Sequence, residues 1–170
     1  MKIGVISDTH GFFHPEIPEV FFGVERIIHA GDIGSRDVLT QLEKIAPVIC
    51  VSGNHEPEQI PSALPDFSLL ELAGKKIILT HSLTTMSWRD FKDALERSES
   101  TNFWAHALVS AELIIFGHTH LALWEQIKGI YFLNPGYAGH DTNEAEPTVA
   151  LLELKPGLIH TEIVKLGSKG

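Results

Sequence analysis

Five short apolar runs in this chain each end in side chains that can bind a metal ion, and this pattern constrains the fold more than any other feature. One run, 26–30, ends in Gly31 and Asp32. The other four runs end in Asp8 and His10, in Asn54 and His55, in His81, and in His118 and His120. Apolar runs of this length are typical of buried strands, and loops at the carboxyl ends of such strands converge on one crevice. The pattern therefore predicts an α/β fold with a single polar site at the edge of its sheet.

The first third of the chain is predicted to alternate strands with helices. Strands are expected at 2–7, 26–30 and 48–52, and helices at 15–24 and 35–45. The second helix has apolar residues at helical spacing, and Ser35 is positioned to cap its N-terminus. An order of β-α-β-α-β is typical of a parallel sheet.

The rest of the chain is predicted to be richer in strands. A hairpin is expected over 69–79, with Gly74 supplying the positive φ that a tight turn needs. A polar loop, 134–147, carries three acidic residues. Its acidic residues are Asp141, Glu144 and Glu146. Further strands are expected at 121–127, 130–133, 148–154 and 158–165.

The segment 86–110 is predicted to be helical in two pieces. Trp88 and Trp104 belong to an aromatic stripe at helical spacing, which favours core packing over a substrate platform. The whole insertion 83–110 joins two strands that carry motifs, so we also expect it to form a wall of the substrate pocket.

Composition and charge exclude several classes of function. The chain has 170 residues, 44% of them hydrophobic and 21% charged, which predicts a single domain over 1–170. The net charge of -9 and the lack of a basic cluster argue against a nucleic-acid partner, and so against a nuclease. No apolar run approaches the ~18 residues of a membrane span, and the N-terminal run is too short for a signal peptide. The single cysteine, Cys50, lies in an apolar run, which favours a buried, reduced thiol and a cytoplasmic location.

Each motif is weak when it is considered alone. Gly31-Asp32 after a strand is also typical of a solvated turn, and His81 can cap a strand end without binding anything. The pair His118 and His120 is stronger, because two histidines at i and i+2 face one centre only where the backbone turns. Together the motifs put carboxylate, amide and imidazole groups at five strand ends, which favours a metal site over a set of structural contacts.

The order and spacing of these motifs resemble the calcineurin-like metallophosphoesterases, and within them the small single-domain YfcE-like phosphodiesterase group. The matching motifs are Asp8-x-His10, Gly31-Asp32, Gly53-Asn54-His55-Glu56, Thr80-His81, Gly117-His118-x-His120 and Asn134-Pro135-Gly136. The resemblance spans residues 2 to about 155. It implies a four-layer α/β/β/α sandwich, in which two mixed β-sheets are flanked by helices.

The resemblance also implies a metal-binding role for seven residues. One metal ion would be bound by Asp8, His10 and His120, the second by Asn54, His81 and His118, and both would be bridged by Asp32. Nitrogen and hard oxygen donors without a thiolate suit divalent transition metals. Manganese is the leading expectation for the two ions, and iron, zinc, nickel and cobalt also fit.

The activity that the resemblance implies is hydrolysis of a small phosphodiester or phosphate ester, by in-line attack of a metal-bridging hydroxide. His55 directly follows a ligand, so we expect it to protonate the leaving alkoxide as a general acid; the alternative is a surface loop histidine. The remaining histidines are expected to be structural or solvent-exposed: His14, His29, His106, His140 and His160.

Two positions depart from the family pattern, and the sequence also leaves one alternative function. Ser82 stands where the family usually has glycine, and Glu56 where many members have aspartate. The alternative function is a non-catalytic metal-binding or protein-interaction scaffold, as in the retromer scaffold subunit, which has lost the histidine that matches His55. Because His55 and every ligand are present here, the enzyme is favoured. A homo-oligomer is compatible with either function.

Overall fold

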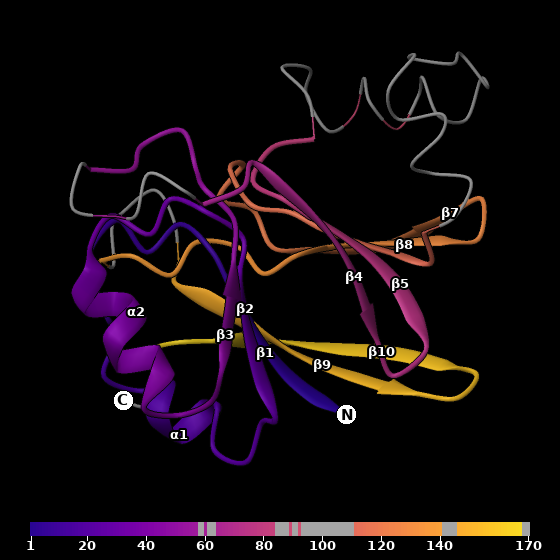
Figure 1. Cartoon of the computed structure of the whole chain (residues 1–170), viewed down its shortest axis with the longest axis horizontal. Helices are drawn as coiled ribbons and strands as arrows, with labels where there is room; N and C mark the ends of the chain where they lie inside the picture. The colour runs from indigo at the N-terminus through magenta and orange to yellow at the C-terminus, as the bar shows by residue number, and fades with distance from the viewer. Residues whose placement is uncertain are drawn as a thin grey trace.

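The structure is a computed structural model that describes residues 1–57, 60, 64–83, 89, 92, 111–140 and 146–167. Strands dominate the described residues, and they form two five-stranded sheets (Figure 1). In chain order the elements are β1 Lys2–Ile6, α1 Ile17–Val20, β2 Arg26–His29, α2 Arg36–Glu43, β3 Val48–Cys50, β4 Phe67–Leu72, β5 Lys75–Thr80, β6 Leu113–Ile115, β7 Leu123–Ile127, β8 Ile130–Asn134, β9 Thr148–Lys155 and β10 Leu158–Lys165.

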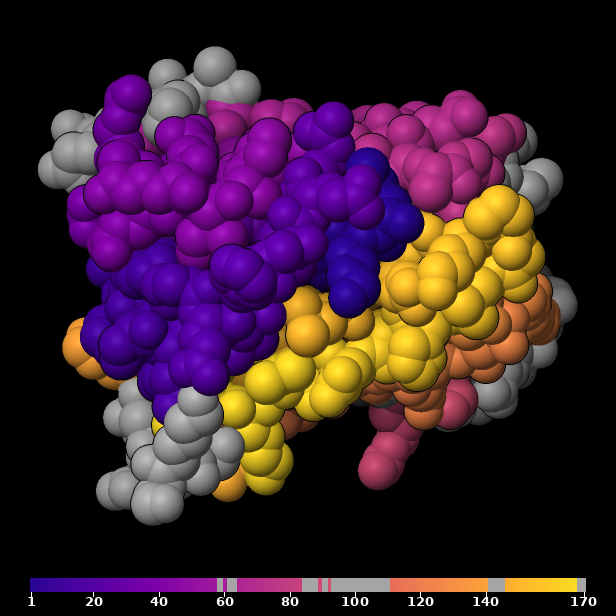
Figure 2. Space-filling view, turned by 90° about the horizontal axis from the view of Figure 1, so that it is seen from below, coloured from indigo at the N-terminus to yellow at the C-terminus, as the bar shows by residue number. Residues whose placement is uncertain are grey.

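The first sheet has the strand order β10-β9-β1-β2-β3. Its β1, β2 and β3 are parallel and are connected through α1 and α2, so the predicted β-α-β-α-β unit is confirmed. On the other side of β1, β9 and β10 add as antiparallel strands. Figure 2 shows this C-terminal segment (yellow) lying against the N-terminal one (indigo).

The second sheet has the order β4-β5-β6-β8-β7. Its β5, β6 and β8 are parallel, while β4 and β7 are antiparallel edge strands, so both sheets are mixed as expected. The predicted hairpin is confirmed as β4 and β5. Ala73 and Gly74 connect them with φ values of 50° and 74°, the left-handed pair that a two-residue hairpin turn requires.

The two helices are shorter than the sequence predicts. α1 ends at Val20 rather than at 24, because Gly23 takes a left-handed φ of 78° that a helix cannot continue through. α2 ends at Glu43 rather than at 45. The predicted cap is confirmed: the Ser35 hydroxyl accepts a 3.2 Å hydrogen bond from the N–H of Asp37.

An apolar core fills the space between the two sheets, which face each other in Figure 1. A second apolar cluster lies between the first sheet and its helices and includes Ile27, Val38 and Leu42. These three layers agree with an α/β/β arrangement. The predicted helices of 86–110, with Trp88 and Trp104, lie outside the described residues except for Arg89 and Lys92, as does most of the predicted pocket wall 83–110. The side chains of the central core include Ile3, Val5, Ile28, Leu79, Leu113 and Leu133.

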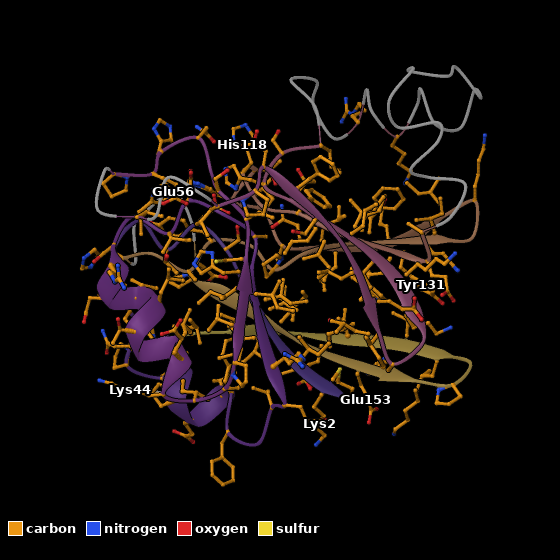
Figure 3. The ribbon with its side chains drawn as sticks, in the orientation of Figure 1. Lys2, Lys44, Glu56, His118, Tyr131 and Glu153 are labelled. Atoms are coloured by element: carbon orange, nitrogen blue, oxygen red, sulfur yellow. The ribbon has the colours of Figure 1, made fainter. Side chains whose placement is uncertain are left out.

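The carboxyl ends of the parallel strands of both sheets meet at one end of the molecule. There the N–H of Asp8 donates to the carbonyl of Gly31 at 3.0 Å, and the N–H of Gly117 donates to that of His81 at 3.0 Å. Figure 3 shows the labelled His118 and Glu56 at this end, opposite Lys2 and Lys44. The fold therefore brings the predicted motif loops together.

Two further observations concern the helices and the single cysteine. No helix among the described residues is long and apolar enough to cross a membrane. Cys50 is half-buried rather than fully buried, and its burial raises the pKa of the thiol to about 11.

Candidate metal centre

All seven expected ligands lie in one cluster, with a buried base and an open mouth. The base is made of Asp8, Asp32 and His81, which are buried. The mouth is made of His10, Asn54 and His118, which are exposed, and of the half-buried His120. Such a gradient keeps the carboxylates away from water and leaves the upper side accessible to a substrate.

The backbone at this cluster is held in an unusual conformation. Left-handed φ values are found at Asp8 (54°), His10 (46°), Asp32 (52°), His118 (69°) and His120 (58°). Elsewhere among the described non-glycine residues, only Ala73 and Lys128 in hairpin turns share this conformation. Strained backbone of this kind persists where a site demands particular side-chain directions. The turning backbone predicted for His118 and His120 is thus confirmed.

Asp8, His10 and His120 form the first group that can hold a metal ion, with one ligand atom of each within 4.8 Å of the others. The Nε2 atoms of His10 and His120 are 3.4 Å apart, and His120 Nε2 is 3.3 Å from Asp8 Oδ1. Asp8 Oδ2 accepts a hydrogen bond from the N–H of His118 at 3.1 Å. Asp8 Oδ1 is buried without a hydrogen-bond partner among the described residues, which fits an oxygen that coordinates a cation.

Asp32 lies between the two halves of the cluster. Its Oδ2 is 3.8 Å from His10 Nε2 and 3.5 Å from His81 Nε2. Its Oδ1 accepts a 2.8 Å hydrogen bond from the N–H of His55. With Asp8 and His81, Asp32 forms the second group whose ligand atoms lie within 4.8 Å. This central position suits a bridging carboxylate.

Asn54 collects the remaining ligands on the other side of Asp32. Its Oδ1 is 2.8 Å from His81 Nε2 and 3.0 Å from His118 Nδ1. The other ring nitrogen of His81, Nδ1, lies 2.8 Å from the carbonyl of Ala30, which can only accept. His81 therefore carries its proton on Nδ1 in the neutral ring and directs an unprotonated Nε2 toward the cluster.

Carboxylates and imidazoles balance their charges in this cluster. Burial by itself would raise the pKa of Asp32, but the contact with the His81 ring and the hydrogen bond from the His55 N–H hold it well below its usual range. Burial would lower the pKa of His81, yet the neighbouring Asp32 raises it. The pKa of His120 is raised by its close contact with the Asp8 carboxylate. Ionised carboxylates that draw positive charge onto nearby histidines form an environment that favours a cation.

Two glycines are required by the close approach of the motif loops. A Cβ atom at Gly53 would stand 2.0 Å from Asp32 Oδ1, and one at Gly117 would stand 2.0 Å from Ser7 Oγ. A side chain at Gly53 would displace a carboxylate oxygen of the cluster, and one at Gly117 would also come within 2.7 Å of Asp8 Oδ2. The glycines that precede Asn54 and His118 therefore belong to the site.

Glu56, a departure from the family pattern, clamps two ligand loops together. Its Oε1 accepts from the N–H of Ile33 at 2.9 Å and from that of Gly53 at 3.1 Å, and its Oε2 accepts from Gly34 at 3.1 Å. The glutamate thus supports the Asp32 loop directly. Ser82 is the other position that departs from the family pattern, and its backbone carbonyl accepts a hydrogen bond from the Thr80 hydroxyl at 3.2 Å.

Asn134 supports the loop that carries His118 and His120. Its side-chain N–H groups donate to the carbonyl of Gly117 at 2.8 Å and to Thr119 Oγ1 at 3.0 Å, and its Oδ1 accepts from Gly136 at 2.9 Å. The sequence contained a signal for this contact, because Asn134 begins the matching Asn-Pro-Gly motif.

His29 is a supporting residue that the sequence did not single out. Its ring is fully buried, and its Nε2 lies 3.0 Å from Thr9 Oγ1, which donates to the carbonyl of Ile33 at 2.8 Å. Because the hydroxyl proton goes to the carbonyl, the Nε2–H of His29 donates to the hydroxyl. Burial lowers the pKa of His29 to about 3, so the ring stays neutral. Thr9 and His29 together join the Asp8 loop to the Asp32 loop.

Tyr137 is a second residue that the sequence missed. Its ring centroid is 4.8 Å from that of His120 and 6.0 Å from that of His10. Burial, followed by the charge of Asp8, raises the pKa of Tyr137. The only sequence signal was its position directly after the Asn-Pro-Gly motif.

His55, the expected general acid, is exposed at the mouth of the cluster. Its ring centroid is 6.4 Å from that of His10. Of the other histidines, His14 and His29 are buried and His140 and His160 are exposed, in agreement with the expected structural or solvent-exposed roles. His106 lies outside the described residues.

The donor set fits divalent transition metal ions. It combines imidazole nitrogens, carboxylate oxygens and one amide oxygen, and no cysteine takes part in either candidate group in the described part of the chain. Such a set is borderline in softness and suits manganese, iron, zinc, nickel or cobalt better than calcium.

Comparison with known proteins agrees with these features. The model of the calcineurin-like phosphoesterase superfamily domain matches residues 1–157. A probable metallophosphoesterase of Methanothermobacter thermautotrophicus is 33% identical, over 99% of this chain and 94% of its own. A phosphodiesterase of Methanocaldococcus jannaschii is 28% identical, over 90% of this chain and 93% of its own.

Solved structures extend the comparison to the fold. Vps29 from Entamoeba histolytica, complexed with zinc, superposes with a TM-score of 0.72 at 22% identity and covers 97% of this chain and 99% of that one. At this identity the similarity shows the fold alone. The match to the family model shows more: this chain belongs to the calcineurin-like phosphoesterase superfamily and is a hydrolase of phosphate esters.

Proposed function

We propose that this chain is a phosphodiesterase that works with two divalent metal ions. The observation that carries the proposal is the convergence of seven donor residues from five loops, with Asp32 Oδ2 within 4 Å of a histidine nitrogen on each side. A carboxylate between two nitrogen-bearing groups is what a bridged pair of ions needs. The bound ions would supply a nucleophilic water of lowered pKa and positive charge for the phosphoryl oxygens.

The proposed ligands divide into two groups around Asp32. Asp8, His10 and His120 would hold one ion, and Asn54, His81 and His118 the other. The buried Asp8 Oδ1, without a hydrogen-bond partner among the described residues, supports the first group. The carbonyl of Ala30, which fixes the tautomer of His81, supports the second.

His55 is the proposed general acid, and its imidazole would donate a proton to the leaving ester oxygen. It directly follows Asn54, and its ring is exposed beside that of His10, where a leaving group can reach it. A positioned acid of this kind contributes about 10²–10⁴-fold to turnover.

Hydrolysis of bis(p-nitrophenyl) phosphate by protein loaded with manganese tests the proposal. We expect turnover that is lost on chelation with EDTA and restored by manganese, because the ligands hold the ions reversibly. p-Nitrophenyl phosphate, assayed in parallel, measures the preference for diesters over monoesters. A preparation that carries two ions per chain and hydrolyses neither substrate would refute the proposal.

The second candidate is a non-catalytic scaffold of the same fold. The similarity to Vps29 at 22% identity shows the shared fold and carries no argument for this function. The presence of His55 in an exposed position argues for the enzyme, because a scaffold has no use for a proton donor at the mouth of the site. The assay above separates the two, since a scaffold would bind metal without turnover.

A further inference from the structure

The two halves of the candidate metal centre hold their histidine rings in different ways. In the second group, the Nδ1 atom of His81 lies 2.8 Å from the carbonyl of Ala30, and this contact fixes the ring. A hydrogen bond from the ring nitrogen that faces away from the ion is the usual way in which a protein orients a metal-binding histidine. In the part of the chain that the structure describes, the Nδ1 atoms of His10 and His120 make no such hydrogen bond. The rings of the first group are therefore oriented by other contacts.

The ring of Tyr137 contacts both of these imidazoles. Its centroid is 4.8 Å from that of His120 and 6.0 Å from that of His10, with an interplanar angle of 37° in each case. The two imidazoles meet edge to face, with centroids 5.4 Å apart and an angle of 70°. All three distances lie in the range of about 4.5–7 Å that is typical of packed aromatic rings. The three rings thus form a triangle in which Tyr137 touches both histidines.

This triangle directs the two imidazoles toward one carboxylate oxygen. The Nε2 atoms of His10 and His120 are 3.4 Å apart, and Nε2 of His120 is 3.3 Å from Oδ1 of Asp8. The side chains of His10 and His120 are 33% and 41% exposed, so solvent leaves room for both rings to turn. Ordering such side chains on binding costs conformational entropy, and a neighbour that already restricts them in the metal-free chain reduces that cost.

Tyr137 can restrict its neighbours because its own loop is fixed. The residue is only 9% exposed, and its carbonyl accepts a 2.7 Å hydrogen bond from the N–H of Thr148. The N–H of the next residue, Ala138, donates to the carbonyl of Ser7 at 3.1 Å, which joins the loop to the end of β1. A Cβ atom at Gly139 would stand 2.3 Å from the hydroxyl oxygen of Tyr137, so this glycine leaves the space that the phenol occupies. The ring is therefore held against the histidines by its backbone and by its surroundings.

We infer that Tyr137 is a positioning residue, whose ring orients His10 and His120 and thereby tightens the binding of the metal ion that the Asp8 group holds. The inference rests on the proposed two-metal centre. Tyr137 acts through the face of its ring, so the hydroxyl group is not required. Among the described residues its ring contacts are with His10 and His120 and not with the histidines of the second group, so only one of the two ions depends on it.

Calorimetric titration of the metal-free protein with manganese tests the inference without any substrate. Tyr137→Ala should weaken one of the two ions about 10- to 100-fold, the usual effect of removing a group that orients a metal ligand. The affinity for the other ion should change less than about twofold. Tyr137→Phe should bind both ions as the wild type does, because it keeps the ring face. Tyr137→Leu fills most of the same space without a ring, so it should fold even where the alanine variant does not, and it should show the same selective loss.

A double variant identifies the ion that is affected. His120→Ala removes a ligand of the first group, so adding Tyr137→Ala to it should cause no further loss of metal affinity. Electron paramagnetic resonance gives a second readout, because two neighbouring manganese ions are magnetically coupled and a single ion is not. At a manganese concentration that fills both sites of the wild type, Tyr137→Ala should show the signal of a single bound ion.

Tyr131→Ala is the matched control for the loss of a tyrosine ring from this part of the chain. Tyr131 is a half-buried tyrosine on β8 that stacks on Trp124, with centroids 4.9 Å apart. Figure 3 shows it at a distance from the labelled His118 and hence from the metal centre. This variant should lower the stability of the fold and leave both metal affinities unchanged.

Several results would overturn the inference. Unchanged affinity for both ions in Tyr137→Ala, or equal weakening of both, would leave Tyr137 a packing role only. A loss in Tyr137→Phe as large as that in Tyr137→Ala would show that the hydroxyl group matters and the ring does not.

The affinities also separate this inference from the proposed function. If the wild type binds two ions but hydrolyses neither p-nitrophenyl ester, the proposed function fails, and a selective loss in Tyr137→Ala would still establish the positioning role. If the wild type is active and Tyr137→Ala binds both ions normally, the positioning role fails and the proposed function stands. A wild type that binds a single ion, with an affinity that Tyr137→Ala does not change, would refute both.

Discussion

The backbone N–H of His55 donates a 2.8 Å hydrogen bond to Oδ1 of Asp32, so the proposed general acid and the proposed bridging ligand are held as one unit. The bond comes from the main chain of His55 and not from its ring. A substitution that removes the ring therefore leaves the support of Asp32 in place. This separates the proton-donating role of His55 from the integrity of the metal centre.

His55→Ala should keep both metal ions bound and lose about 10²–10⁴-fold in turnover, because only the proton donor is removed. The loss should be larger for an ester with an alkyl leaving group than for a p-nitrophenyl ester, whose leaving group needs little protonation. Rates on both esters, together with metal analysis of the purified variant, measure this. A loss of equal size on both esters would show that His55 acts on the phosphate or on a metal ion.

Asp32→Asn should reduce metal binding as well as activity, because the buried carboxylate that faces both groups of histidines loses its charge. His120→Ala should remove the ion of the Asp8 group, since it deletes a nitrogen 3.3 Å from Asp8 Oδ1. Metal content after gel filtration measures both effects. Full occupancy by two ions in either variant would contradict the assignment of that residue.

Glu56→Gln should lower the free energy of unfolding by about 2 kcal/mol, because an amide has one acceptor oxygen where the carboxylate has two that together accept from three backbone N–H groups. Metal affinity should fall with it, since the Asp32 loop loses its clamp. Glu43→Gln, an exposed glutamate on α2, is the matched control and should have little effect. Denaturant unfolding of the metal-free proteins gives the comparison, and equal stability of the two variants would show that the clamp is dispensable.

His29 should make the metal-free protein less stable in acid. Burial lowers its pKa to about 3 in the folded chain, against about 6.5 when unfolded, so the unfolded state binds more protons between these values. Stability due to the neutral ring is complete above pH 6.5 and is lost as the pH falls toward 3, by at most ~1.4 kcal/mol per pH unit. Unfolding free energies at pH 7, 6, 5 and 4 should fall more steeply for the wild type than for His29→Gln. Parallel curves would exclude this effect.

The sequence predicted the parts of the site that depend on local pattern. Each ligand follows an apolar run, and strand direction brings such positions to one edge of a parallel sheet, so Asp8 and Asp32, which follow the neighbouring strands β1 and β2, could be predicted to meet. The hairpin at Gly74 was predictable for the same reason, because its turn chemistry is local.

Contacts that depend on distances between loops could not be predicted in this way. Glu56 reaches the N–H groups of Ile33 and Gly34 from a different loop, and nothing in its own segment indicates this. The ring contact of Tyr137 with His10 likewise exists only after the two sheets have packed, and the buried link from His29 to Thr9 only after β1 and β2 have paired. Helix ends were also wrong by a few residues, because Gly23 rather than the apolar pattern ends α1.

The most direct test of the two-metal centre is a titration of metal-free protein with manganese, followed by metal analysis and by the rate of bis(p-nitrophenyl) phosphate hydrolysis at each step. Two groups of donors that share Asp32 predict binding of two ions per chain, with activity that continues to rise until the second ion is bound. Full activity with one ion per chain, or two bound ions with no hydrolysis, would contradict the account.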